Sequence, residues 1–181
     1  VLELIRRGAS VDVQNDEGGT TLMEACMAGH KQIVLDLLEA AASIEVNSVR
    51  GGTALLCAAS SGHTGIVREL LSRGARIDAR DSLNGTALMH AASQGHCDVL
   101  SLLLVHCRAT LGGGFVDQRD ELGESALTCA VAGGHDECVR RMLHAGADAL
   151  GGELTALQLA VVLPARYRLA VHACAAVPAH L

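Results

Sequence analysis

The chain has 181 residues, of which 50% are hydrophobic and 19% are charged, and its formal net charge at pH 7 is -6. It contains one Phe, one Tyr and no Trp. A single large core normally uses several aromatic side chains, each of which buries about 150–250 Å². The composition therefore argues against a β-sandwich or barrel, whose strands favour aromatic and β-branched residues. It favours a thin core of Leu, Ala and Val.

Charge and hydropathy exclude two classes of partner. Acidic residues outnumber basic residues by 20 to 14, whereas proteins that bind nucleic acid or an anionic membrane surface carry a basic patch. The longest apolar stretches, 154–163 and 169–177, are shorter than the roughly 20 residues that a membrane-spanning helix needs. No signal peptide opens the sequence at Val1, so we expect a fragment of a longer intracellular protein.

The seven cysteines form no C-x-x-C pair, and their spacing fits neither a zinc finger nor a zinc ribbon. Their odd number and the length of the chain also argue against a small fold held together by disulfides. We expect reduced thiols that pack as small hydrophobic side chains, with no bound metal and no cofactor.

A repeat runs through the sequence. Gly-His dipeptides begin at residues 29, 62, 95 and 134, so that successive copies are 33, 33 and 39 residues apart. Two further sets of residues keep nearly the same spacing, which is the signature of a repeat architecture. A hydroxyl residue stands nine positions before each of these glycines, at Thr20, Thr53, Thr86 and Ser125. An apolar pair follows each dipeptide, at Leu37–Leu38, Leu70–Leu71, Leu102–Leu103 and Met142–Leu143.

In chain order, residues 1–15 predict the second helix and finger of a truncated unit, and complete units follow at 16–48, 49–81, 82–119 and 120–148. In the unit 49–81, apolar residues at helical spacing before Gly62 predict a first helix. Those at 66–71 predict a second helix that ends at Gly74. A short extended segment and a hairpin-like finger then lead into the next unit. Because isolated helices shorter than about 12–15 residues are marginal at best, the units must stabilise one another by stacking.

Two units depart from this period. The unit 82–119 has six extra residues, which we assign to a lengthened finger at 111–116. After residue 148 the segment 155–160 is in register with a first helix, but Pro164 stands where Gly-His is expected. Such degeneracy is typical of a terminal repeat that caps a stack, so we expect a capping repeat at 149–181.

The unit 49–81 resembles the ankyrin repeat, with Gly52-Thr53-Ala54-Leu55 at its first helix, Gly62-His63 after it, and Leu70-Leu71 followed by Gly74-Ala75. The resemblance covers nearly the whole chain. It implies an all-α solenoid of stacked helix-turn-helix units with hairpin-like fingers, in a single domain over residues 1–181. It also implies that each Gly-His histidine ties neighbouring repeats together. The family's Pro and His at the first helix are absent from every unit, the His being replaced by Met23, Leu56, Met89, Thr128 and Gln158.

The resemblance further implies a concave groove, formed by the exposed side of the first helices and by the finger tips, that binds a partner protein. The groove positions on the helices are Glu24, Met27, Cys57, Ser60, Ser61, His90, Ser93, Gln94 and Cys129. The finger-tip positions are Asp16, Glu17, Arg50, Asp81, Leu83, Asn84, Phe115, Asp117, Asp120 and Glu121. Because the groove lacks Trp and Tyr anchors and several tips are acidic, we expect the partner to supply basic or aromatic side chains.

The expected function is a non-catalytic protein-interaction module, acting as a monomeric domain within a longer chain. Two alternatives stay open: a regulatory or substrate-recruiting segment beside an enzyme such as a kinase or ubiquitin ligase, and a structural scaffold of many repeats. Cys57, His90 and Cys129 share one repeat position, which invites a nucleophile-and-base interpretation. Stacked helices lie about 8–10 Å apart, however, and catalysis needs about 2.6–3.2 Å between such groups, so we expect no enzyme activity.

Overall fold

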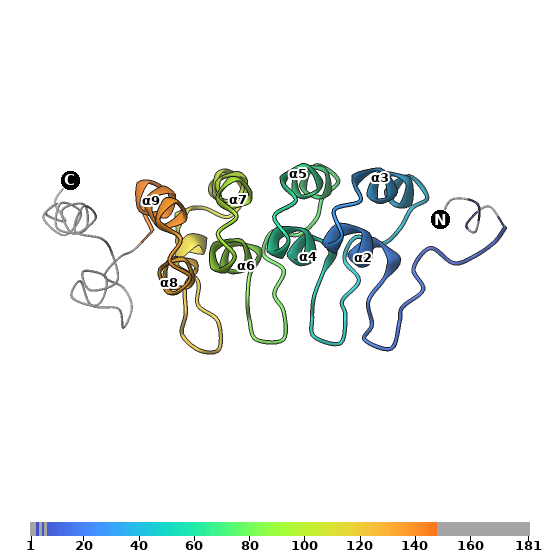
Figure 1. Ribbon diagram of the computed structural model, residues 1–181, viewed down its shortest axis with the longest axis horizontal. Coiled ribbons are helices and arrows are strands. Elements are labelled where there is room, and N and C mark those ends of the chain that lie inside the picture. Colours follow the sequence, from blue (N-terminus) through green and yellow to red (C-terminus); the bar gives the residue numbers. More distant parts are fainter. Residues whose placement is uncertain (1–2, 4, 6, 148–181) are drawn as a thin grey trace, which may run out of the picture.

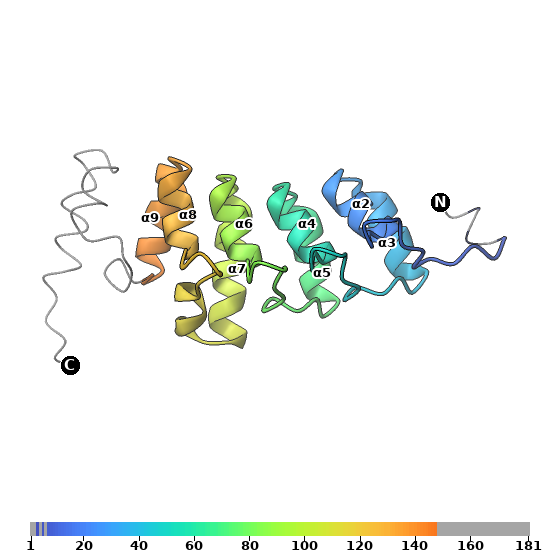
Figure 2. The same cartoon turned by 90° about the horizontal axis from the view of Figure 1, so that it is seen from below.

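The structure is a computed structural model that describes residues 3, 5 and 7–147 of the chain (Figure 1). Four helix pairs stack side by side within these residues, and three fingers between them project from the row of first helices, with a fourth before the first pair (Figures 1 and 2). The first helices are α2 (Thr21–Met27), α4 (Ala54–Ser60), α6 (Ala87–Ser93) and α8 (Ala126–Ala132). The second helices are α3 (Lys31–Glu39), α5 (Thr64–Ser72), α7 (Cys97–Thr110) and α9 (Asp136–His144). The prediction of an all-α solenoid is confirmed.

Each first helix begins at the hydroxyl residue of the repeat. The side chains of Thr20, Thr53, Thr86 and Ser125 each accept a hydrogen bond from the backbone N–H three residues later. Such an N-cap satisfies a donor that the helix cannot pair internally. The helices therefore start where the sequence predicted, although the family's Pro is missing from this turn.

The core is thin because small side chains line the contacts between first helices. Ala58, Ala59, Ala91 and Ala92 are completely buried, at 0% exposure, and they let neighbouring backbones approach closely. Leucines of the second helices cover this layer from the other side. In α7 the buried pair is Leu103 and Leu104, which corrects the predicted pair Leu102–Leu103 by one residue.

Three of the four histidines of the Gly-His dipeptides tie the repeats together, as the resemblance implied, whereas His30 is exposed. The Nε2 atoms of His63, His96 and His135 lie 3.1, 3.0 and 3.0 Å from carbonyl oxygens of the preceding unit. The acceptors are Met27 O, Ser60 O and Ser93 O. Each ring thus pairs with the open end of the first helix before it.

The extra residues of the third complete unit lie outside its finger, which corrects the predicted lengthened finger at 111–116. Helix α7 has 14 residues, whereas α3 and α5 have nine, and the 3-10 helix η1 (Gly113–Asp117) follows it. The finger itself closes at the bridge between Arg119 and Ser125, which has the same span as the bridge between Arg80 and Thr86. The insertion therefore extends the second helix and leaves the finger unchanged.

The expectation of reduced thiols is wrong for one pair of cysteines. Cys97 and Cys138 form a disulfide with a Cα–Cα distance of 5.1 Å, whereas Cys26, Cys57, Cys107 and Cys129 are free. The pairing was not foreseen because the two residues occupy different positions of their repeats, at the first residue of α7 and the third of α9. The predicted capping repeat at 149–181 lies outside the described residues, as do parts of the truncated unit at 1–15.

Candidate binding groove

A hollow of about 270 Å³ opens between the second and third fingers of the described stack. Five of its lining residues were predicted as groove residues: Met27, Cys57, Ser60 and His90 lie on first helices, and Ser61 directly follows α4. Arg50 and Asp81, predicted at finger tips, complete the lining together with Gly52 and Leu56. The structure thus brings helix and finger residues of three successive units into one site.

Asp81 and His90 are in direct contact within this hollow. His90 Nε2 lies 2.8 Å from Asp81 Oδ2, which joins a groove-facing side chain of α6 to the turn of the finger directly before this helix. The second carboxylate oxygen, Asp81 Oδ1, accepts hydrogen bonds from the backbone N–H groups of Leu83 and Gly85 at 2.9 and 2.7 Å. Asp81 therefore shapes the finger turn as well as the groove.

The same turn recurs in each finger with a different acceptor. Asn15 Oδ1 accepts from the N–H groups of residues 17 and 19, Ser48 Oγ from that of residue 52, and Asp120 Oδ1 from those of residues 122 and 124. Side chains of Asn, Asp and Ser stabilise turns in this way. Asp120, predicted as an acidic tip residue, is consequently engaged with its own backbone.

Neighbouring fingers are joined edge to edge by backbone hydrogen bonds. Val49 N–H donates to Glu17 O, Ser82 N–H to Arg50 O, and Glu121 N–H to Leu83 O, at 2.9, 2.9 and 3.0 Å. Each bond connects the tip of one finger to the tip of the next. The tips therefore form one continuous rim rather than independent loops.

The groove position of α6 is filled by other residues in the neighbouring first helices. In α2, Glu24 Oε1 accepts from Asn15 Nδ2 at 3.4 Å, and in α8, Cys129 Sγ lies 3.8 Å from Glu124 Oε2. In each of these contacts a first-helix side chain reaches toward the finger that precedes its helix. At Glu24, His90 and Cys129 the groove position thus couples helix and finger.

Neither groove cysteine is activated as a nucleophile. Burial, followed by the charge of Glu24, raises the pKa of the Cys57 thiol above its ordinary value. Burial, followed by the charges of Glu124 and Asp120, raises the pKa of Cys129 to about 12. Since the thiolate is the reactive species, these environments argue against the nucleophile-and-base interpretation.

Two predicted tip residues lie elsewhere. Phe115 and Asp117 belong to η1, and Phe115 packs partly buried against the core. Their removal from the tips follows from the insertion, which ends in η1 before the finger starts. Of the other predicted positions, Glu24, Met27, Gln94, Asp16, Glu17, Arg50, Leu83, Asn84 and Glu121 are exposed, and Ser93 is half-buried.

An apolar feature of the rim was only partly foreseen. Val49, Leu83 and Leu122 are exposed aliphatic side chains on three successive tips, with exposed fractions of 75%, 56% and 76%. Leu122 occupies the same finger position as Leu83, 39 residues later, so the repeat spacing contained this signal. The rim therefore combines acidic and aliphatic side chains.

None of the helices within residues 3, 5 and 7–147 has the length and hydropathy that crossing a bilayer requires. In the same part of the chain, no group of three or more His, Cys, Asp or Glu side chains is placed to hold a metal ion.

The family model of ankyrin repeats in three copies matches three overlapping stretches, residues 1–81, 42–113 and 77–150. A comparison with curated proteins gave no match. Together the matched stretches cover residues 1–150, which include all four described helix pairs. The chain therefore belongs to the ankyrin repeat family.

Proposed function

We propose that this chain, like ankyrin repeats generally, is a protein–protein interaction module: a non-catalytic domain that binds a partner protein through its concave groove and finger tips. The observation that carries the proposal is the hollow between the fingers, where Met27, Cys57 and His90 from three first helices meet Arg50 and Asp81 from two fingers. A continuous site built by three units is suited to an extended segment of a partner rather than to a single small group.

The chemistry of the rim supports a partner with basic and apolar side chains. Asp16, Glu17 and Glu121 are exposed acids on the tips, and Val49, Leu83 and Leu122 add aliphatic surface beside them. Complementary charge speeds association and selects against like-charged partners. The small residues Ser60 and Ser61 at the floor of the hollow leave room for a large side chain of the partner, such as an aromatic ring.

A peptide array tests this proposal. The chain should prefer peptides that contain Lys or Arg together with Leu, Phe, Tyr or Trp. Its affinity for them should fall as the salt concentration rises. A triple variant of the groove, Glu24→Ala with His90→Ala and Gln94→Ala, should bind the selected peptides at least about 10-fold more weakly, roughly 1.4 kcal/mol.

The matched control changes three exposed residues of second helices on the opposite face: Lys31→Ala, Gln32→Ala and Arg68→Ala. This variant should keep the affinity of the original chain. A preference for acidic peptides would overturn the assigned partner chemistry, and equal affinities of the two triple variants would overturn the assigned groove.

A further inference from the structure

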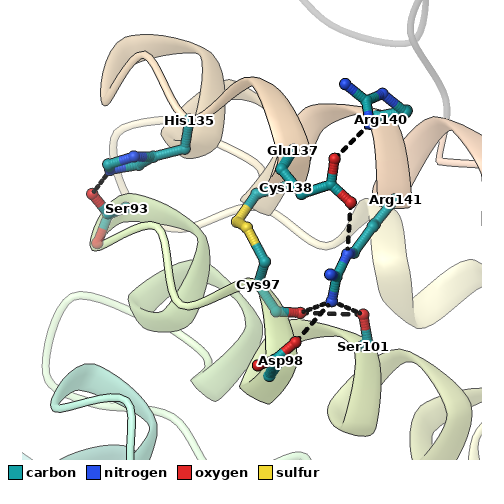
Figure 3. Close-up of a disulfide and its surroundings, with 9 residues drawn as sticks. All are labelled: Ser93, Cys97, Asp98, Ser101, His135, Glu137, Cys138, Arg140 and Arg141. Carbon is teal, nitrogen blue, oxygen red and sulfur yellow. Dashed lines mark hydrogen bonds and ion pairs between the residues drawn. A yellow bond between two sulfur atoms is a disulfide. The ribbon is translucent and has the colours of Figure 1, made fainter.

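The disulfide between Cys97 and Cys138 joins α7 to α9 across the junction of the last two described units (Figure 3). Cys97 is the first residue of α7, and Cys138 is the third residue of α9. At the two preceding junctions the matching positions hold Thr64 with Val99 and Lys31 with Ile66. Among the described junctions, a covalent link at these positions is therefore possible only here.

The two cysteines differ in access to solvent. Cys138 is completely buried, at 0% exposure, where the preceding units place the core residues Ile66 and Val99. Cys97 is half-buried and lines a hollow of about 370 Å³ together with Gly62, Thr64, His96 and Arg141, among others. A small thiol or disulfide in solution therefore has a route to Cys97 and none to Cys138.

The electrostatic surroundings also favour the thiolate of Cys97 over that of Cys138. Cys97 lies at the N-terminus of a 14-residue helix, where the helix dipole favours a thiolate. The Arg141 guanidinium donates to Cys97 O at 2.8 Å, and it also pairs with the neighbouring Asp98 carboxylate at 3.1 Å. Cys138 follows Asp136 and Glu137 in α9, and burial disfavours its thiolate. Cys97 is thus the sulfur that exchanges with solution.

We propose that Cys97 and Cys138 are a reversible redox couple that fixes the unit α8–α9 onto the unit before it. In the oxidation, the Cys97 thiolate attacks one sulfur of a low-molecular-weight disulfide, RSSR, such as glutathione disulfide. This forms a mixed disulfide at Cys97 and releases RS⁻. Cys138 then gives up its proton and attacks Cys97 Sγ, which forms the protein disulfide and releases the second RS⁻. The two thiol protons end on the two RS⁻ ions, so two electrons pass from the cysteines to RSSR, giving 2 RSH.

Arg141 keeps the couple reversible, because it holds α9 against α7 without help from the disulfide. Figure 3 shows its side chain extending from α9 to the first turns of α7, where it reaches Cys97 O, Asp98 and Ser101. It donates to Cys97 O, Asp98 Oδ1 and Ser101 Oγ on α7, and its Nε donates to Glu137 Oε1 on α9 at 2.9 Å. After reduction, this network leaves the two thiols within reach of each other, and a buried Cys thiol packs as a small hydrophobic side chain.

The redox state sets how firmly the fourth complete unit is attached. The disulfide closes a loop with a sequence separation of 41 residues, and a cross-link of this kind suppresses opening of the enclosed segment. The enclosed segment contains α8 with its groove residue Cys129, and the finger that carries Leu122. Reduction therefore loosens one end of the concave surface, while the units α2–α3 and α4–α5 keep their packing.

The first test follows disulfide formation in the full chain. Fully reduced protein is placed in buffers with a series of glutathione to glutathione disulfide ratios, quenched with acid, alkylated and mapped by mass spectrometry. The expected result is a Cys97–Cys138 disulfide that forms from the folded protein through a glutathione adduct on Cys97. Adducts confined to Cys138, or a disulfide that forms only in denaturant, would overturn the proposal.

The second test measures hydrogen exchange of the oxidised protein, the reduced protein and the variant with both Cys97→Ser and Cys138→Ser. Amides of α8 and α9 should exchange roughly 10²-fold faster in the reduced protein and in the double variant, whereas amides of α4 should not change. Equal protection of α8 and α9 in both redox states contradicts the proposal, and this comparison needs no substitution.

A third measurement tests the role of Arg141 as a positioning residue. Arg141→Ala should slow the intramolecular step, so that the glutathione adduct on Cys97 accumulates, while adduct formation itself continues. The control is Arg73→Ala, which removes an arginine paired with Glu69 of its own helix. Equal rates of disulfide closure in the two variants would show that Arg141 does not hold the couple together.

Discussion

The Asp81 carboxylate connects the third finger of the described stack to the groove: one oxygen accepts from Leu83 and Gly85 N–H, and the other lies 2.8 Å from His90 Nε2. The finger tip and the groove wall are therefore one hydrogen-bonded unit. A partner that contacts His90 also meets a side chain whose position depends on the finger turn. Substitutions at Asp81 can therefore separate the effect of its charge from its effect as a hydrogen-bond acceptor.

Asp81→Asn should be nearly neutral for stability, whereas Asp81→Ala should destabilise the domain by about 1–2 kcal/mol. The asparagine keeps an acceptor for the two backbone donors, as Asn15 does at the same position of the first finger. The alanine leaves both donors without their acceptor, and a typical hydrogen bond contributes about 0.5–1.5 kcal/mol. Urea unfolding of the three proteins measures the difference. Equal losses for both variants would mean that the charge of Asp81, rather than its acceptor geometry, supports the turn.

Alanine in place of Gly62 should destabilise the chain for two separable reasons: backbone strain and a clash with an inter-repeat histidine. Gly62 and Gly74 both have positive φ values, of 79° and 88°, so that alanine is strained at either position. A Cβ on Gly62 would lie 2.5 Å from His96 Nδ1, whereas one on Gly74 would meet nothing within 4 Å. We expect Gly74→Ala to cost about 1 kcal/mol and Gly62→Ala to cost about 1–2 kcal/mol more, because the His96 ring must leave Ser60 O.

A double-mutant cycle provides the control for this difference. In a His96→Ala background the ring is gone, so Gly62→Ala and Gly74→Ala should cost the same amount within about 0.5 kcal/mol. The measurement is again the free energy of unfolding in urea. If the gap between the two glycine variants persists in the His96→Ala background, contact with the ring is not its cause.

The helix pairs could be predicted from the sequence because several independent signals agreed on their ends. The hydroxyl caps, the Gly-His dipeptides and the apolar spacing all mark the same boundaries in each unit. The place of the six extra residues could not be predicted in this way, because counting the period does not distinguish a longer helix from a longer finger. The glycines at 112–114 favoured a loop, yet Leu100, Leu103, Leu104 and Cys107 continue the helical spacing and are all buried in α7. That pattern is the signal that could have placed the insertion.

The groove residues could be predicted individually from the sequence. Their contacts with one another could not, because these depend on how fingers and helices are arranged in the fold. Asp81 and His90 are nine residues apart, on a finger and a helix, and only the angle between these elements makes the two side chains meet. The disulfide was even harder to predict from the repeat pattern of the sequence. Cys97 and Cys138 occupy different repeat positions, and they meet because α7 and α9 pack against each other in the stack.

The half-buried thiol of Cys129 predicts a loss of stability at high pH. Its pKa in the folded chain is about 12, compared with an ordinary value of 9.0, so above pH 9 the unfolded chain releases this proton while the folded chain keeps it. The folded state then binds more protons than the unfolded state, and the free energy of unfolding falls as pH rises from 9 toward 12. The contribution is fully present below pH 9 and should decline by about 1 kcal/mol at pH 10.

Comparison with Cys129→Ser isolates this contribution. Urea unfolding of both proteins under reducing conditions, at pH 7, 8, 9 and 10, gives the stability difference between them as a function of pH. The difference should be constant up to pH 8 and should then shift against the original chain. A difference that is independent of pH would show that Cys129 titrates normally in the folded protein.

The fourth first helix has a capping arrangement that compensates for the missing family histidine. Ser125 Oγ accepts from Thr128 N–H, and Thr128 Oγ1 accepts from Ser125 N–H at 2.8 Å, so that the two residues cap each other. In α2, α4 and α6 the position of Thr128 is filled by the buried apolar residues Met23, Leu56 and Met89, which supply core packing there instead. Thr128→Val keeps the shape of the side chain and removes its acceptor. It should destabilise the domain by about 1 kcal/mol and speed hydrogen exchange at the start of α8.

The control for this substitution is Thr21→Val, which makes the same chemical change at an exposed position in the first turn of α2. Because surface substitutions away from caps and cores usually change stability by no more than about 0.5 kcal/mol, this variant should unfold close to the original chain. If both valine variants lose the same stability, the cost reflects the lower helix propensity of valine. If Thr128→Val alone is destabilised and exchange at Ser125 N–H accelerates with it, the reciprocal cap supports the start of α8.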